Sequence, residues 1–468
     1  MIVPAVSGAK TAVAQTEVAQ STYSFDISVN SIADGVAQIG AVSGWRIAYS
    51  IDLPEIEGAR IINGNMSVPA AIDILLRGTG LEYRETGENS LILTDPAAQG
   101  SQSDNAVTGP VLIETADAQT DLPPAYAGGQ VATGGRLGML GNTDIMDAPV
   151  SITSYTSEKI ADQQAETIAD VLQNDPSVRA PNAETANLDT YQIRGFGVNL
   201  FNTSEVSFNG AYGVAPTYRV QSGMAERIEV VKGPNALLNG MSPTGAVGGA
   251  INIVPKRAGA TDLNRVSADY GRGAQAGGDL DVSRRFGAND EFGVRFNGGY
   301  SNGDTYLDRQ TKETSLGALA LDYEGDRFRA SVDLIDQREN LSAPAREFRI
   351  NSGVTMPDAP DGSTNVIQAW EWSDAVDRSG LVQAEYDALD NIIVFGSFGG
   401  GRTELDRLFG TPTITNGKGD YNDAGLSYRR FQTDRWSVSG GVRGEFQTAE
   451  ITHKTSFEAT RYEDVLRQ

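Results

Sequence analysis

The glycines of the stretch "ERIEVVKGPNALLNGMSPTGAVGGAINIVPKR", Glu226–Arg257, suggest either a phosphate-binding loop or tight turns inside a larger fold. A Walker loop needs Gly-Lys followed by Ser or Thr, and no lysine follows these glycines. A second candidate, "GTPTITNGKGD", has Pro412 in place of the first glycine and Gly419 in place of the hydroxyl residue. A dinucleotide fingerprint needs a helix after its glycines, whereas "GAVGGAINIV" continues into β-rich sequence. The sequence therefore argues against phosphate binding at both places.

Side chains suited to catalysis or metal binding are scarce. The chain has 468 residues, one histidine and no cysteine, so it cannot build a thiolate metal site or one with several histidines. A Ser-His-Asp triad would depend on His453, which lies in the polar run "ITHKTSF" and is interpreted as a solvated histidine at a strand end. The formal net charge of -24 argues against a nucleic-acid partner, because phosphates bind clustered Lys and Arg. We predict neither an enzyme nor an intrinsic cofactor.

The start of the chain resembles an export signal. No apolar run reaches the roughly 18 residues of a membrane-spanning helix. The start "MIVPAVSGAKTAVAQ" contains Ala12-Val13-Ala14, a pattern of the kind that signal peptidase cleaves. We interpret residues 1–20 as the remainder of a leader.

Residues 21–95 are predicted to form a small α+β domain. The segment "YSFDI" alternates as a strand does, and Ile32, Val36 and Ile39 follow at helical spacing. Ser67 can cap a second helix, and "LEYRETGENSLILT" is typical of a hairpin.

Residues 96–130 are predicted to be a linker, because small, polar and Pro/Gly residues cannot bury enough apolar surface to fold. One apolar island interrupts it, and this island consists of Pro110, Val111, Leu112, Ile113, Glu114 and Thr115. An extended apolar island can add as a strand to the edge of a partner's sheet. A chance apolar cluster is the alternative.

Residues 131–258 mix helix and strand signals, as an α/β domain does. The run "SEKIADQQAETIADVLQNDP" predicts one or two helices with Ile168, Val171 and Leu172 inward and an end at Pro176. The segments "TYQIRGFG", "EVSFNG", "RIEVVKGP" and "INIVPK" predict short strands separated by glycine turns.

Residues 259–468 predict antiparallel β-structure throughout. The segment "EFGVRFNGGY" places Phe292 and Phe296 on one face and Arg295 and Asn297 on the other, and "RFRASVDLID" and "RWSVSGGVRGEF" repeat this alternation. In a soluble sandwich the polar face meets water. In an outer-membrane barrel the apolar face meets lipid and the polar face a wet lumen.

Connection lengths favour the barrel. Short turns are predicted at 287–291, 324–327, 388–391 and 432–435, and longer loops at 301–313, 339–377 and 402–422. Short and long connections alternate in outer-membrane barrels. About ten strands are predicted over this range.

Several motifs in order carry a family resemblance: "FDISVNSIADGVAQIGAVSGWRIAYS", "AAIDILLRGTGLEYR", "YQIRGFG", "RIEVVKGPNALLNG" and "GAVGGAINIVPKR". Together they resemble the TonB-dependent outer-membrane siderophore receptors that carry an N-terminal secretin/TonB signalling domain. The resemblance implies a signalling domain at 21–95, a TonB box at 110–115, a plug domain at 131–258 and the first part of the barrel at 259–468. Plugged transporters close with about 22 strands, whereas about ten are predicted here, and an open edge in lipid would leave backbone groups unpaired. We therefore expect an N-terminal fragment of a longer receptor, with an incomplete barrel wall.

The resemblance also implies structural residues of the plug. These are Arg194, Gly195, Gly233, Gly248 and Gly249, with Arg194 buried and paired and the glycines allowing close turns inside the lumen.

A bulky ferric siderophore needs aromatic walls and a few polar groups. Segments predicted to face outward supply the candidates Asn199, Phe201, Tyr212, Tyr218, Trp370 and Trp372. As alternatives, the tyrosines pack the plug against the wall and the tryptophans belong to an aromatic girdle at the membrane interface.

The implied function is uptake of a ferric siderophore across the outer membrane, powered by TonB with ExbB and ExbD. The resemblance further implies an anti-sigma regulator as partner of residues 21–95, a periplasmic N-terminal domain and a monomer surrounded by outer-membrane lipid. Cobalamin, haem or a glycan remain alternative ligands. A secretin-like channel subunit and a soluble β-sandwich adhesin are alternatives of other classes.

Overall fold

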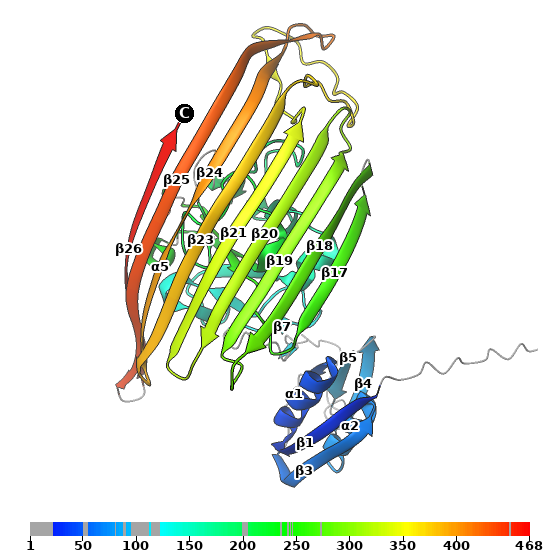
Figure 1. Cartoon of the computed structure of the whole chain (residues 1–468), viewed down its shortest axis with the longest axis vertical. Helices are drawn as coiled ribbons and strands as arrows, with labels where there is room; N and C mark the ends of the chain where they lie inside the picture. Colours follow the sequence, from blue (N-terminus) through cyan, green and yellow to red (C-terminus); the bar gives the residue numbers. More distant parts are fainter. Residues whose placement is uncertain are drawn as a thin grey trace, which may run out of the picture. The chain divides into compact units, whose positions relative to one another are not determined.

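The computed structural model divides the chain into two compact units, residues 1–116 and residues 117–468 (Figure 1). The boundary falls inside the predicted linker. The structure describes residues 22–49, 55–79, 81–87, 90–94, 112–113, 122–198, 205–234, 236–240, 243, 245, 247–271, 274–448 and 451–468. The predicted leader, residues 1–20, lies outside the described residues.

The first unit is a small α+β fold. Its elements are β1 (Tyr23–Ser31), α1 (Ile32–Ser43), β2 (Arg46–Tyr49), β3 (Glu55–Met66), α2 (Val68–Leu76), β4 (Glu82–Gly87), β5 (Ser90–Thr94) and β6 (Leu112–Ile113). Strand β1 pairs with β3, and β2 runs parallel to β5, which forms the predicted hairpin with β4. The two helices and these strands share one buried apolar core.

The ends of α1 follow from its sequence. The Ser31 side chain accepts a hydrogen bond from the backbone N–H of Asp34 at 3.0 Å, and the helix ends at Gly44 in the left-handed region with φ 70°. Val36 and Ile39 are buried as predicted. Ser67 precedes α2, but its side chain makes no cap hydrogen bond.

Residues 122–258, here the plug segment, carry short strands and helices. They are β7 (Ala125–Tyr126), β8 (Gly134–Arg136), η2 (Gly138–Leu140), β9 (Asn142–Asp144), β10 (Ser151–Thr156), α3 (Ser157–Gln163), α4 (Ile168–Leu172), β11 (Val178–Arg179), β12 (Tyr191–Ile193), β13 (Phe196–Val198), β14 (Val206–Phe208), η3 (Ser222–Met224), β15 (Ala225–Lys232), α5 (Ala236–Asn239) and β16 (Gly249–Pro255). A four-stranded sheet has the order β10-β15-β16-β14. Ile168, Val171 and Leu172 of α4 are fully buried, as predicted.

Strands β15 and β16 are the two strands predicted for Glu226–Arg257, and they pair antiparallel. Gly249 opens β16 with φ 152°, and a Cβ there would lie 2.2 Å from the carbonyl oxygen of Val231. A Cβ at Gly248 would lie 2.6 Å from the carbonyl oxygen of Ile193. Glycine is required at both positions because neighbouring backbone comes too close for any side chain.

The wall sheet consists of long antiparallel strands in chain order. They are β17 (Leu263–Gly271), β18 (Gln275–Phe286), β19 (Phe292–Asp304), β20 (Thr311–Glu324), β21 (Phe328–Ser342), β23 (Trp372–Leu389), β24 (Ile392–Ile414), β25 (Tyr421–Thr448) and β26 (Ile451–Arg467), with the short β22 (Arg349–Ile350) added beside β24. In the described structure the sheet is open, and β17 and β26 are its two edges (Figure 1). Among the described residues, no helix combines the length and hydropathy that a membrane span needs.

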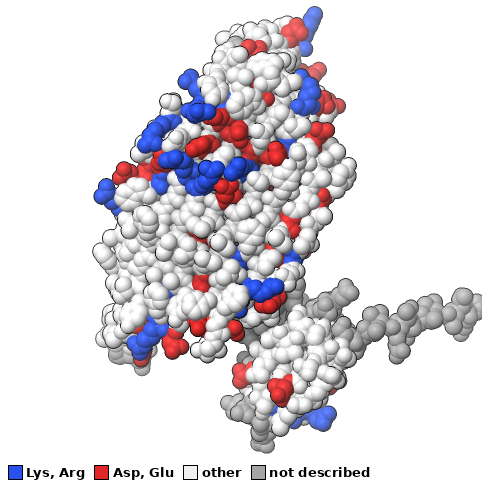
Figure 2. Space-filling model, viewed as in Figure 1, with Lys and Arg blue, Asp and Glu red and all other residues white. Residues whose placement is uncertain are grey.

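The two faces of the wall sheet differ as the alternation predicts. One face contacts the plug segment through residues such as Gln337 and Asp377. The opposite, outward face carries exposed apolar side chains, including Phe296, Leu334 and Phe398. Figure 2 shows that charged residues gather in a band across the upper part of the outward face, above a largely uncharged area.

The connections are shorter than predicted. The turns at 287–291, 324–327 and 388–391 are confirmed, but the turn at 432–435 is wrong because β25 runs without a break from Tyr421 to Thr448. Thr433 and Arg435 are buried on the plug-facing side, so the alternation continues through this polar stretch. The predicted long loops shorten to 305–310, 343–371 and 415–420, because strands continue into mixed polar and apolar sequence.

Gly249→Ala is expected to lower the free energy of unfolding by about 2–4 kcal/mol, because the new Cβ would collide with the Val231 carbonyl oxygen 2.2 Å away. Gly240→Ala is the matched control, since Gly240 has φ 72° but open space around it. The control should lose only about 1 kcal/mol. Denaturant-induced unfolding of both variants measures the two losses, and equal losses would contradict the steric explanation.

Candidate functional site

The plug segment is attached to the wall sheet by ion pairs, some buried and one half exposed at Glu166. Lys312 of β20 lies 2.8 Å from Glu166 of the plug segment. At the end of the plug segment, Arg257 pairs with Asp333 of β21, and Lys256 lies 3.5 Å from Asp281 of β18. Ion pairs therefore hold the end of the plug segment on the wall sheet, in addition to the covalent connection of the backbone.

Arg219 makes the most extensive of these contacts. Its guanidinium donates to Asp189 at 3.1 Å, to the Ala186 carbonyl at 2.8 Å and to Glu339 of β21 at 2.8 Å. Only 4% of Arg219 is exposed. Burial by itself would lower the pKa of Arg219, but Asp189 and Glu339 outweigh it and raise the pKa above its ordinary value.

The prediction that Arg194 is buried is wrong. Arg194 is exposed and has φ 52°, because it lies in the tight turn between β12 and β13 next to Gly195 with φ 83°. A side chain in such a turn points away from the core. The residue with the predicted role is Arg219, whose signal in the sequence was its place among apolar and small residues in "AYGVAPTYRV".

Residues around Arg219 complete the docking surface. The Thr217 backbone N–H donates to Asp377 of β23 at 3.1 Å, and its hydroxyl lies 2.9 Å from that of Thr403 of β24. The Gln221 backbone N–H donates to Gln337 of β21 at 2.9 Å. This part of the plug segment thus contacts three neighbouring strands at once.

The predicted ligand residues are not brought together as one site. Tyr212 and Tyr218 are buried, with 5% and 3% exposed, and burial raises the pKa of each. The Tyr212 carbonyl accepts a hydrogen bond from Ser437 of β25 at 2.8 Å, and Tyr218 packs with Leu405 and Phe431 of the wall sheet. The packing alternative therefore describes both tyrosines in this structure.

The tryptophans lie elsewhere. Trp370 is 49% exposed in the turn before β23. Trp372 pairs with Ser342 and Leu408 on the outward face, where its ring lies 6.3 Å from that of Tyr428. Trp372 therefore does not face the plug segment. Asn199 and Phe201 lie outside the described residues.

The structure brings together an arginine cluster that sequence reasoning missed. Arg407 of β24 and Arg429 of β25 are paired in register on the plug-facing side. Arg346, from the segment 343–371, has its Cζ 4.5 Å from the centre of the Phe409 ring, and the Cζ of Arg407 lies 4.4 Å from the same centre. The Cζ of Arg407 also lies 5.2 Å from the centre of the Phe431 ring, and Phe431 packs against Tyr218. The cluster therefore borders the docked part of the plug segment.

The predicted TonB box is described only at its centre. Leu112 and Ile113 form β6, which pairs antiparallel with Tyr49 and Ala48 of β2. The other four residues, Pro110, Val111, Glu114 and Thr115, lie outside the described residues.

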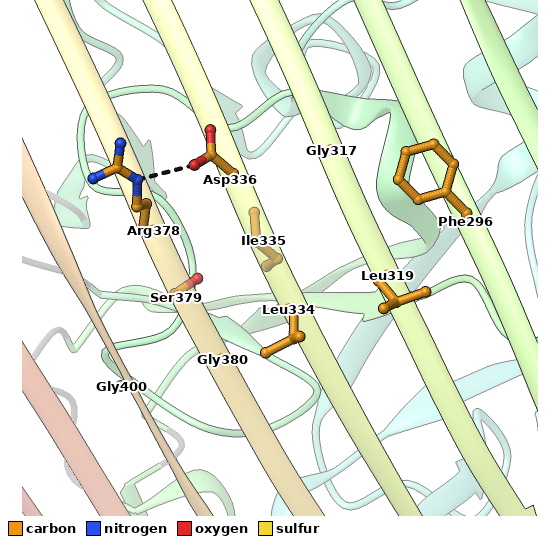
Figure 3. A pocket seen from close by; sticks show the side chains of 10 residues that line it. All are labelled: Phe296, Gly317, Leu319, Leu334, Ile335, Asp336, Arg378, Ser379, Gly380 and Gly400. Carbon is orange, nitrogen blue, oxygen red and sulfur yellow. Dashed lines mark hydrogen bonds and ion pairs between the residues drawn. The ribbon is translucent and has the colours of Figure 1, made fainter.

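A hollow of about 550 Å³ lies on the outward face of the wall sheet (Figure 3). Three glycines leave the backbone bare there: Gly317 lies between Phe296 and Leu334, and Gly380 and Gly400 lie on the other side of Leu334. The hollow lies on the side of the sheet opposite the plug segment, so it is separate from the arginine cluster. Among the described residues, no group of acidic or histidine side chains could hold a metal ion.

Comparison with known proteins gives the family of the central region. Residues 144–247 match the model of the TonB-dependent Receptor Plug Domain. These residues are a TonB-dependent receptor plug domain. The matched range lies inside the plug segment described above.

The chain is also similar to curated receptors beyond the plug domain. It is 40% identical over 361 residues to a ferrichrome receptor of Yersinia enterocolitica, covering 77% of this chain and 47% of that protein. It is 26% identical over 386 residues to the ferripyoverdine receptor of Pseudomonas aeruginosa, covering 77% of this chain and 46% of that protein. The chain spans about half the length of the curated relatives it matches.

Solved structures of siderophore receptors are also similar to this chain. The ferric preacinetobactin receptor of Acinetobacter baumannii superposes with a TM-score of 0.70 at 36% identity, covering 73% of this chain and 51% of that one. The ferripyoverdine receptor of Pseudomonas aeruginosa superposes with a TM-score of 0.56 at 17% identity, covering 95% of this chain and 56% of that one. The second likeness concerns the fold alone.

Arg219→Gln should lower the free energy of unfolding by about 3–5 kcal/mol, because it leaves the Asp189 and Glu339 carboxylates buried without their cation. Arg378→Gln is the control. This variant removes a half-exposed ion pair of 2.9 Å with Asp336 on the outward face. The free energy of unfolding should therefore fall by less than about 1 kcal/mol. Unfolding in detergent measures both, and an Arg219 loss as small as the control's would show that the buried contacts do not hold the plug domain.

Proposed function

We propose that the chain belongs to a receptor that takes up a ferric siderophore across the outer membrane in a TonB-dependent way. The observation that carries the proposal is a plug domain docked by buried polar contacts on one face of an antiparallel sheet whose other face is apolar. A relative with 40% identity is a ferrichrome receptor, and a structure with 36% identity is a ferric preacinetobactin receptor. The names of both proteins state that they are receptors for a siderophore or its ferric complex.

In the proposed mechanism the ligand binds on the outer side of the plug domain and shifts it, and the shift releases the linker to TonB. TonB, driven by ExbB and ExbD, then pairs with residues 110–115 by strand addition. The pairing of β6 with β2 supports this step, because it shows that the backbone of Leu112 and Ile113 forms an antiparallel ladder.

Ile113→Pro should abolish uptake of iron from the siderophore and leave binding unchanged, because proline removes the backbone N–H that a ladder requires. Cells that carry only the variant are grown under iron limitation with a panel of siderophores, and cobalamin is included because the chain is 30% identical over 139 residues to a vitamin B12 transporter. Val107→Pro, in the same linker, is the control and should transport normally. Normal transport by Ile113→Pro would remove 110–115 as the TonB box.

The first unit is proposed to report ligand occupancy to an inner-membrane anti-sigma regulator. Its support is the fold. The ferripyoverdine receptor structure covers 95% of this chain and so extends into the first unit, whereas the preacinetobactin receptor structure covers 73%. A separate unit that only some of the matching structures share is suited to an added task rather than to transport itself.

Deletion of residues 21–95 should abolish ligand-dependent induction of the receptor's operon, while uptake by constitutively expressed protein persists. A reporter fused to the operon promoter and iron uptake by the same cells measure the two activities. Loss of uptake in protein that is normally folded and exported would place the unit in the transport path instead.

A further inference from the structure

The arginine cluster has an arrangement that folding alone disfavours. Arg407 and Arg429 are directly opposite each other in the β24–β25 ladder, and like charges at such positions repel. Arg346 adds a third guanidinium against the same Phe409 ring that Arg407 covers. Three cations therefore lie close together, and their mutual repulsion destabilises this part of the sheet.

Several other arginines of these strands form ion pairs, although Arg435 of β25 donates to the Thr403 hydroxyl instead. On the outward face Arg402 lies 2.6 Å from Asp434 and Arg430 lies 2.7 Å from Asp406. On the plug-facing side Arg443 lies 2.7 Å from Glu385. Within the described part of the chain, Arg346, Arg407 and Arg429 form no ion pair, and the Nε of Arg407 is buried without a hydrogen-bond partner.

The acidic groups near the cluster lie around Arg346. Glu371, Asp423 and Glu347 act on Arg346, and the cation of Arg349 opposes them. Glu371 is already used, because it accepts hydrogen bonds from the backbone N–H groups of Gly410 and Gln368. For Arg407, the neighbouring groups with the largest electrostatic effect are the cations Arg346 and Arg429 and the hydroxyl of Tyr218.

We propose that Arg346, Arg407 and Arg429 bind a ferric complex that carries net negative charge, with catecholate or carboxylate oxygens around the iron. This inference rests on the proposed function and specifies its ligand. Three doubly ionised catecholates around Fe³⁺ leave a negative complex, whereas three singly ionised hydroxamates leave a neutral one. Guanidinium groups donate several hydrogen bonds to such oxygens, and the rings of Phe409 and Phe431 supply flat apolar walls.

The test compares three probes on the receptor purified in detergent: a ferric tris-catecholate, ferric citrate and a neutral ferric tris-hydroxamate. Quenching of tryptophan fluorescence gives each affinity. The receptor should prefer an anionic complex, and Arg407→Gln and Arg429→Gln should each weaken that binding on the order of tenfold or more. Added salt should weaken it further in the parent than in the variants.

Arg430→Gln is the matched control, one residue beyond Arg429 on the same strand, on the outward face and paired with Asp406 at 2.7 Å. It should bind like the parent. Thermal unfolding of Arg407→Gln should be unchanged or shifted upward, since the variant relieves repulsion, and this separates a lost contact from a lost fold.

Preferential binding of the neutral hydroxamate, with no effect of Arg407→Gln or Arg429→Gln, would overturn the inference and leave siderophore uptake standing. Failure of all three ferric complexes to bind would overturn both the inference and the proposed function. A preference for ferric citrate over the tris-catecholate, or the reverse, supports the inference and tells the two oxygen donors apart.

Discussion

The buried charge of Arg219 holds the plug segment against the wall sheet. Its guanidinium donates to Asp189 and the Ala186 carbonyl within the plug segment and to Glu339 of the wall sheet. Because an unpaired buried charge costs several kcal/mol, both partners must occupy their positions together. Folding of the plug segment and its docking on the wall sheet are therefore coupled.

The wall sheet satisfies this need on one face only. Alternation along each strand sends Gln337 and Glu339 toward the plug segment, while Leu334 and Asp336 point outward. The outward face is apolar over part of its height and charged over the rest, where pairs such as Arg402–Asp434 neutralise each other. A strand of this length can thus pass from an apolar surrounding to a polar one without a change of register.

The pattern of side chains predicted the faces, the helices and the β15–β16 pair, because each depends on neighbours in sequence. The alternation of inward and outward side chains that places Phe296 outward also continues through Thr433 and Arg435. The turn predicted there was wrong because it rested only on the polar composition of the stretch. The partner of Arg219 could not be predicted, since Glu339 lies 120 residues away in sequence. The same holds for Arg407 and Arg429, whose opposition depends on the register of two strands.

The packing around Tyr218 offers a physical link between the arginine cluster and the plug segment. Arg407 contacts Phe431, Phe431 packs against Tyr218, and Tyr218 stands next to Arg219 and Thr217 in the chain. An anion that drew the guanidinium of Arg407 toward itself would change the wall of the pocket that Tyr218 fills, and close-packed side chains do not absorb such a change without moving. Arg219 and Thr217 in turn contact β21, β23 and β24. A ligand bound at the cluster would therefore act, through Phe431 and Tyr218, on the contacts that hold the plug segment.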